Sequence, residues 1–148
     1  MNITSIKITD LLSVVSGRLS YGISRIINKR FKEASISLTA DQWMVMAILW
    51  ERDRQYQNDI AKQTHKDKAS ITRIINTLET EGFVERDYDG FDGRKRIILL
   101  TTDGMRVREQ STAIVEQCFN EAIEGVDKEQ LIYVKSVLNK IIFNIERI

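Results

Sequence analysis

None of the 148 residues of this chain is proline, and only 7 are glycine. Proline interrupts helices because it lacks a backbone donor and clashes with the preceding turn, so long helices meet few interruptions here. Apolar side chains recur every three or four residues over residues 6–33, 102–124 and 127–148, which predicts an amphipathic helix in each segment. We therefore predict a mainly α protein with long helices at both ends.

A helix-turn-helix is predicted between these long helices. Thr39 and Gln42 have the spacing of a capping box, which begins one helix. A short helix over residues 58–64 follows, and Asp67 is suited to cap a further helix that ends at Gly82. Two short helices joined by a tight turn form a helix-turn-helix.

A β-hairpin is predicted directly after this unit. Residues 83–87 and 96–100 carry strand-forming side chains, and the loop between them contains two glycines. A helix-turn-helix followed by such a hairpin, called the wing, is a winged helix. The predicted fold class is therefore mainly α with a small β-hairpin wing.

The terminal helices carry more apolar surface than one winged helix would cover. An intramolecular core is one explanation, and a second copy of the chain is the other, which we favour because apolar stripes of this size seldom stay exposed. The chain is then a single domain, 1–148, that forms a homodimer. Its winged helix-turn-helix covers residues 38–101, and residues 6–37 and 102–148 form the helical dimerisation region.

The net charge of +1, from 22 basic and 21 acidic residues, argues at first against nucleic acid as a partner. The charge is uneven, however. Residues 109–148 are acidic, whereas the middle of the chain contains two basic clusters. These clusters are Lys62, Lys66, Lys68 and Arg73, and then Arg94, Lys95 and Arg96. Near neutrality overall thus conceals a basic centre.

Several classes of function are disfavoured by residues that the chain lacks. One cysteine cannot form an internal disulfide, and one histidine cannot supply the usual zinc site. We find no glycine-rich phosphate loop and no nucleophile beside a base, so we expect no enzyme, catalytic residue, metal or cofactor. Without a bilayer-spanning apolar run or a signal sequence, the expected location is the cytoplasm.

Polar side chains cover the helix face opposite the isoleucine stripe of residues 68–81. Cations, hydroxyls and an amide are the groups that hydrogen-bond base edges in the major groove of DNA, so this face is a candidate recognition surface. An ordinary polar surface is the alternative. The candidate residues, with one lysine from the preceding turn, are Lys66, Lys68, Ser70, Thr72, Arg73 and Asn76.

The wing offers a second candidate contact. Arg94 falls at the hairpin tip, where an arginine is narrow enough to enter a minor groove. Asp92 is predicted to pair with its guanidinium, and Lys95 and Arg96 continue the basic run toward the strand. A solvent-exposed ion pair without a partner is the alternative.

Aromatic and cationic side chains also suggest a ligand pocket. The helix that ends at about Glu51 carries Trp43, Met46 and Trp50, and the polar stretch 52–57 that follows it carries Tyr56. The first helix carries Arg18, Tyr21 and Arg25. A stripe of aromatic residues and methionine at helical spacing is also typical of a hydrophobic core. Both interpretations stay open.

Together these residues resemble the MarR family of transcriptional regulators. The matching segments share the order and spacing of the family's winged helix over about residues 38–104. They are Leu38–Trp43, Asp59–Ala61, Asp67–Arg73, Leu78–Arg86, Asp92–Arg94, and Leu100 and Thr101 with Gly104.

The resemblance implies a homodimeric regulator, most often a repressor, that binds a pseudo-palindrome in double-stranded DNA. It implies that Ser70, Thr72 and Arg73 face the major groove and that Arg94 enters the minor groove. It also implies release of DNA when a small aromatic or anionic ligand binds. The alternative is a winged-helix module for protein assembly or RNA binding.

Overall fold

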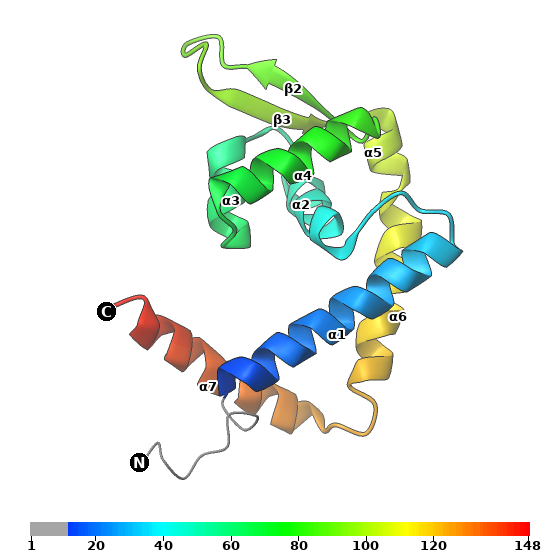
Figure 1. The fold of residues 1–148 in the computed structure, drawn as a ribbon, viewed down its shortest axis with the longest axis vertical. Helices are drawn as coiled ribbons and strands as arrows, with labels where there is room; N and C mark the ends of the chain where they lie inside the picture. The colour runs from blue at the N-terminus through cyan, green and yellow to red at the C-terminus, as the bar shows by residue number, and fades with distance from the viewer. Residues whose placement is uncertain (1–11) are drawn as a thin grey trace. The chain divides into compact units, whose positions relative to one another are not determined.

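The computed structural model describes residues 12–148, and it confirms a mainly α fold with a small β-hairpin wing (Figure 1). The first turn of the helix predicted from residue 6 lies outside the described residues. The elements are α1 Leu12–Glu33, α2 Ala40–Glu51, β1 Gln55–Tyr56, α3 Gln57–Thr64, α4 Lys68–Thr80, β2 Val84–Tyr88, β3 Arg96–Leu100, α5 Thr102–Arg106, α6 Arg108–Ala122 and α7 Lys128–Ile145.

The predicted ends of the helices around the helix-turn-helix are confirmed. Thr39 Oγ1 accepts from the Gln42 amide (3.2 Å), and the Gln42 side chain accepts from the Thr39 amide (2.9 Å). Asp67 caps α4 by accepting from the Ser70 amide at 2.8 Å. Gly82, with φ of 80°, ends α4 because the left-handed backbone there costs glycine little.

The sheet contains one strand that the sequence did not predict. Its order is β1-β3-β2, all antiparallel, with Val84 opposite Leu100 and Tyr88 opposite Arg96. Gln55 and Tyr56, in the polar stretch 52–57, form β1 on the other edge of β3. Gln55 is 4% exposed, and its amide donates to the Ile48 carbonyl at 3.0 Å. A polar side chain that is buried because its hydrogen bonds are satisfied does not add to the apolar pattern by which a strand is predicted.

One hydrophobic core joins the winged helix to parts of the long helices. It contains Ile27 and Phe31 of α1 and Val115 and Cys118 of α6. Cys118 is 1% exposed, as expected for a cysteine in the middle of an apolar stripe. The remaining members come from the winged helix and its entry: Ile36, Leu38, Val45, Met46, Leu49, Ile60, Ala61, Ile71, Ile75, Leu78, Val84 and Ile98.

The single helix predicted over residues 102–124 is wrong, because the structure has two helices with a break at Val107. The short α5 is fastened to the winged helix. Thr101 caps it by accepting from the Gly104 amide (3.0 Å), and the Thr101 amide donates to the Phe83 carbonyl (3.1 Å). The apolar spacing continues across Val107, so it did not reveal the break.

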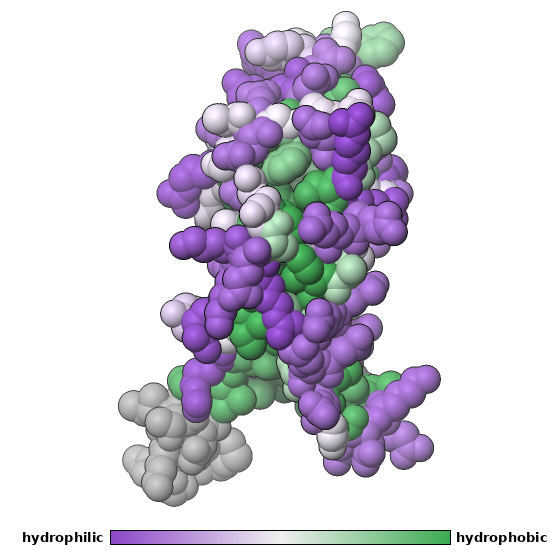
Figure 2. Space-filling model, turned by 90° about the vertical axis from the view of Figure 1, so that its right-hand side faces the viewer, coloured by the Kyte–Doolittle hydropathy of each residue, from purple (hydrophilic) through white to green (hydrophobic). Residues whose placement is uncertain are grey.

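The described residues up to Cys118 form one compact unit, and Phe119–Ile148 form another. In the second unit Gly125 has a φ of 77°, and the Asp127 amide donates to Gln130 Oε1 (3.1 Å) at the start of α7. No residue of α7 is buried. On one face of the molecule green, apolar side chains reach the surface between purple, hydrophilic ones (Figure 2). None of the helices within residues 12–148 is long and apolar enough to cross a membrane.

Candidate nucleic-acid interface

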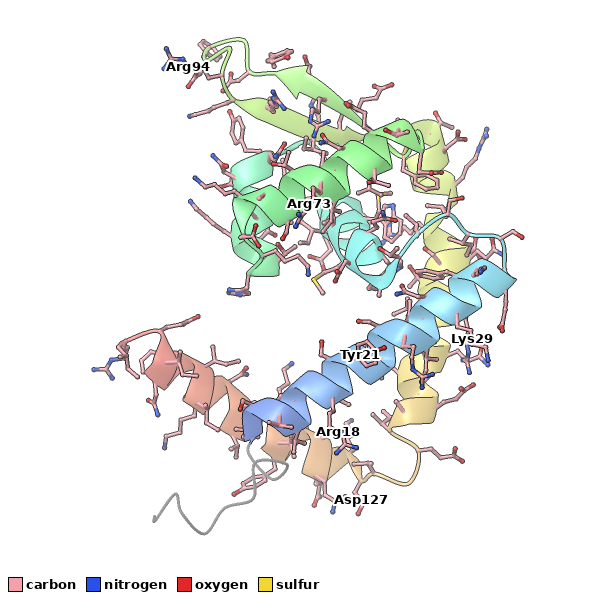
Figure 3. The ribbon with its side chains drawn as sticks, viewed as in Figure 1. Arg18, Tyr21, Lys29, Arg73, Arg94 and Asp127 are labelled. Carbon is pink, nitrogen blue, oxygen red and sulfur yellow. The ribbon has the colours of Figure 1, made fainter. Side chains whose placement is uncertain are left out.

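The two faces of α4 separate packing from the candidate DNA contacts. Ile71, Ile75 and Leu78 are fully buried in the core and Ile74 packs against it, so the polar side chains lie on the other face of the helix. Lys68 and Arg73 are exposed on that outer face, and Figure 3 shows Arg73 on α4. The helix therefore presents its polar residues to solvent as the sequence predicted.

A chain of hydrogen bonds orders the first turn of α4 and leads to Arg73. Ser70 Oγ donates to Asp67 Oδ2 at 2.7 Å, and Arg73 Nη2 donates to Ser70 Oγ at 3.3 Å. The bonds from the Ser70 amide and hydroxyl lower the pKa of Asp67, with a further contribution from the charge of Arg73. Asp67 therefore stays ionised at neutral pH and orients Ser70 and, through it, Arg73.

Thr72 joins the two helices of the helix-turn-helix. It is half-buried, donates to the Lys68 carbonyl (2.9 Å) and accepts from Gln57 Nε2 of α3 (2.9 Å). A base contact by Thr72 stays a prediction. The hydroxyl already has a positioning role, because it fixes α3 against α4.

Arg86 of β2 fastens the wing to α4, and sequence reasoning did not select it. Its side chain is only 12% exposed, and its Nη1 lies 2.7 Å from Glu79 Oε1. Its Nη2 donates to Asn76 Oδ1, so this candidate DNA contact is held by the wing. The signal was present in the sequence, since Arg86 is two residues from the apolar Val84 and thus on the same face of the strand.

Tyr56 fastens the loop of the wing, residues 89–95, from the opposite side. Its hydroxyl donates to Asp89 Oδ2 at 2.6 Å, and Lys95 Nζ lies 5.5 Å from the centre of its ring. The bond to Asp89 raises the pKa of Tyr56, and the same bond lowers the pKa of Asp89. We predicted Tyr56 in a ligand pocket, whereas the contacts found here are with the wing.

Arg94 lies at the far end of the wing, where Figure 3 shows it pointing away from the fold. The predicted pairing between Asp92 and its guanidinium is wrong in detail. Asp92 Oδ1 accepts from the backbone amide of Arg94 at 3.1 Å, and no ion pair of Arg94 is found within residues 12–148. A two-residue spacing suits this local turn better than a contact between side-chain ends.

An open groove of about 670 Å³ lies between α3 and the wing. Four cations and one carboxylate line it, so its charge suits a polyanion. The sequence placed Arg94, Lys95 and Arg96 at the wing. Of the α3 residues opposite them, it singled out Lys62 as a member of the first basic cluster and not as a DNA contact. The lining residues are Tyr56, Gln57, Asn58, Asp59, Lys62, Arg94, Lys95 and Arg96.

Lys66 is held by another carboxylate. Its Nζ lies 3.1 Å from Asp41 Oδ1 of α2, and its side chain is 26% exposed. A DNA contact by Lys66 therefore requires this ion pair to open, whereas Lys68 has no ion pair among the described residues and is exposed.

The residues predicted for a ligand pocket occupy different environments. Met46 is fully buried in the core, and Trp50 Nε1 donates to the Gly104 carbonyl at 2.9 Å, so both have structural roles. Trp43 packs edge-on against Trp50, with ring centres 6.2 Å apart. The α1 residues of this prediction, Arg18, Tyr21 and Arg25, are exposed, and Figure 3 labels the first two.

Comparisons with known proteins agree with the geometry. Residues 38–95, which hold α2 to the end of the wing loop, match the model of the MarR family. The winged helix-turn-helix of this chain is therefore similar to those of MarR-type regulators. The chain is 28% identical over 127 residues to the HTH-type transcriptional regulator YdgJ of Bacillus subtilis, covering 86% of this chain and 77% of YdgJ.

Solved structures share the fold of this chain. A MarR protein from Peptoclostridium difficile matches 99% of this chain and 94% of its own, with a TM-score of 0.85 and 22% identity. BpsR of Bordetella bronchiseptica, whose DNA binding is regulated by 6-hydroxynicotinic acid, matches 92% of this chain and 96% of its own, with a TM-score of 0.82 and 21% identity.

Proposed function

We propose that this protein represses transcription by binding a pseudo-palindromic site in double-stranded DNA as a homodimer. The outer face of α4 enters the major groove with Lys68, Ser70 and Arg73, while Arg94 enters the adjacent minor groove. The observation that carries the proposal is the fastening of the wing to α4 through Arg86, Glu79 and Asn76. These contacts fix the position of the wing, with its cations, relative to the cations of α4. A protein that contacts the major and the minor groove of one duplex at the same time needs such a fixed arrangement.

A second copy of the chain accounts for the apolar surface of the terminal helices. On α1, Leu12, Val15 and Leu19 are 48%, 49% and 64% exposed. On α7, Ile142 and Ile145 are 50% and 62% exposed. A self-complementary contact that covers such stripes is the usual solution in a twofold dimer. Leu19→Glu is expected to weaken self-association in sedimentation, whereas Lys29→Glu, at an exposed ion pair of the same helix, leaves it intact.

A small aromatic or anionic ligand is proposed to release the DNA. BpsR shares the fold and responds to such a molecule. In this chain the Nε1 of Trp43 is buried and has no acceptor within residues 12–148. Because an unpaired buried donor is costly, an oxygen of a bound ligand would stabilise this site.

Selection of preferred duplexes from random DNA tests the function. We expect the wild type to enrich one inverted repeat and to bind it more tightly than RNA of the same length. Arg73→Ala and Arg94→Ala are each expected to weaken binding at least tenfold at fixed salt. Arg106→Ala is the matched control, because Arg106 is an exposed arginine on α5 whose recorded ion pair is with Asp103.

Two results would contradict this function. The first is the absence of any enriched sequence. The second is equal binding of RNA, which would favour the alternative of a winged helix for RNA or protein assembly.

A further inference from the structure

Phe91 is an aromatic side chain that the fold does not use. It lies in the loop of the wing and is 104% exposed, whereas the phenylalanine of the core, Phe31, is fully buried. A side chain with this exposure contributes no packing to the free protein. It becomes useful only where a partner removes it from water.

The loop holds Phe91 in place although its ring is free. The Phe91 amide donates to Asp89 Oδ1 at 3.0 Å, and the other oxygen of Asp89 accepts from Tyr56 at 2.6 Å. The Asp89 amide donates to the Lys95 carbonyl at 3.0 Å, which closes the loop. The backbone of Phe91 is thus fixed through Asp89 to Tyr56 of β1, so a partner meets a preformed contact and little ordering is needed.

The surroundings of Phe91 specify the charge of this partner. Arg94, Lys95 and Arg96 follow within five residues and are exposed. Asp92, the nearest carboxylate in the sequence, accepts from the Arg94 amide at 3.1 Å. An apolar ring beside three cations suits a partner with an anionic backbone and apolar faces between its charges. Duplex DNA has this combination, because the deoxyribose edges that line its minor groove lie between phosphates.

We propose that Phe91 enters the minor groove beside Arg94 and packs against deoxyribose carbons on the groove wall. This inference rests on the proposed function and deepens it. Arg94 supplies a positive charge in the groove, while Phe91 supplies an apolar contact at the same base-pair step of the DNA. The ring presses on the groove wall, so sites with a deformable or narrow A·T-rich minor groove at this position bind best.

Salt dependence separates the two contributions. A contact to phosphate releases counterions, whereas an apolar contact releases none. Phe91→Ala is therefore expected to weaken binding to the selected duplex about tenfold at every salt concentration, with an unchanged slope of log K against log salt. Arg94→Ala weakens binding and also makes that slope shallower by about 1. Phe91→Leu, which keeps an apolar side chain, retains most of the affinity.

Tyr88→Ala is the matched control in the same wing. Tyr88 is an aromatic residue of β2, is 62% exposed, and lies opposite Arg96 in the sheet rather than in the loop. We expect its affinity to change less than twofold. Thermal unfolding of free Phe91→Ala is expected to match the wild type, which excludes loss of the fold as the cause.

Each other outcome has a defined meaning. Wild-type affinity in Phe91→Ala, together with weakened Arg94→Ala, would overturn the role of Phe91 and leave the proposed function standing. A changed salt slope in Phe91→Ala would also overturn it, because the contact would then be electrostatic. Failure of the wild type to prefer any duplex would overturn both proposals.

Discussion

At the base of the wing, where β2 and β3 meet α4 and α5, Arg86 is 12% exposed and bonds to two α4 side chains. At the loop of the wing, Phe91 is 104% exposed, and Arg94 has no ion pair within residues 12–148. Both regions are rich in charge. The guanidinium at the base is used for internal contacts, whereas in the loop the carboxylate of Asp89 bonds to Tyr56 and the guanidinium of Arg94 stays without an ion pair among the described residues. The difference indicates that the base of the wing is a rigid support and that the loop is the part that binds. A side chain without partners inside the protein is available to a partner outside it.

This comparison predicts different effects of substitutions in the two regions. Changes at the base should lower the free energy of unfolding, whereas changes in the loop should lower DNA affinity alone.

Gly104→Ala is expected to have the largest effect on stability. A Cβ at Gly104 would overlap the Phe83 carbonyl oxygen, and the Gly104 carbonyl accepts from Trp50 at 2.9 Å. Forcing these backbones apart should lower the free energy of unfolding by about 3 kcal/mol. The control is Gly93→Ala in the loop, where a Cβ meets no atom within 4 Å. Its expected change in a denaturant titration is below about 0.5 kcal/mol, and equal losses in both variants would contradict the distinction.

Arg86→Ala is expected to have the next largest effect. It removes bonds to Glu79 and Asn76 and leaves a gap between β2 and α4, at a cost of about 2 kcal/mol. DNA affinity should fall too, because the wing is then no longer fixed relative to α4. Arg96→Ala, at an exposed position of β3, should leave the unfolding midpoint unchanged. A fully stable Arg86→Ala variant would show that the wing is not fastened at this point.

Tyr56→Phe is expected to have the smallest effect, and a dependence on pH. The pKa of Tyr56 is raised by its bond to Asp89, so this contribution to stability is complete below the ordinary value of 10.0 and is lost as pH rises through the raised value. The pKa of Asp89 is lowered, so the contribution is present above 3.8 and is lost as pH falls through the lowered value.

The difference in Tm between the wild type and Tyr56→Phe should therefore be constant through the neutral range and disappear at both extremes. The other charged side chains that act on this bond are Lys95, Asp59 and Asp92. A difference that changes between about pH 6 and pH 8 would show that another group is responsible.

Most of the fold was predictable because apolar periodicity and capping residues report local structure directly. The bounds of α4 and β3, for example, follow from Asp67, Gly82 and a short strand-forming run. Two features were not predictable in this way. Gln55 of β1 is buried through hydrogen bonds rather than through apolar character. The break at Val107 lies where the apolar spacing continues, so the spacing does not reveal it.

The candidate site was predictable in its residue types but not in its contacts. Arg73 and Arg94 are exposed where the sequence placed them. Arg86 and Asp89 were missed because their roles depend on partners in other elements, on α4 for Arg86 and on β1 for Asp89. Lys66 is the opposite case: the sequence marked it as a DNA contact, but its ammonium group is already paired with Asp41, which composition cannot reveal. Local patterns thus find the elements of a site, and tertiary packing decides which charges stay available.

The central claim is that α4 and the wing loop contact two different grooves of one duplex. Footprints of the wild type and Arg94→Ala on the selected DNA test it directly. We expect Arg94→Ala, at a concentration that saturates the DNA, to lose protection of minor-groove sugars at the outer edges of each half-site. Protection of guanine N7 in the major groove should persist in the same variant. Loss of both protections together, or of neither, would contradict the account.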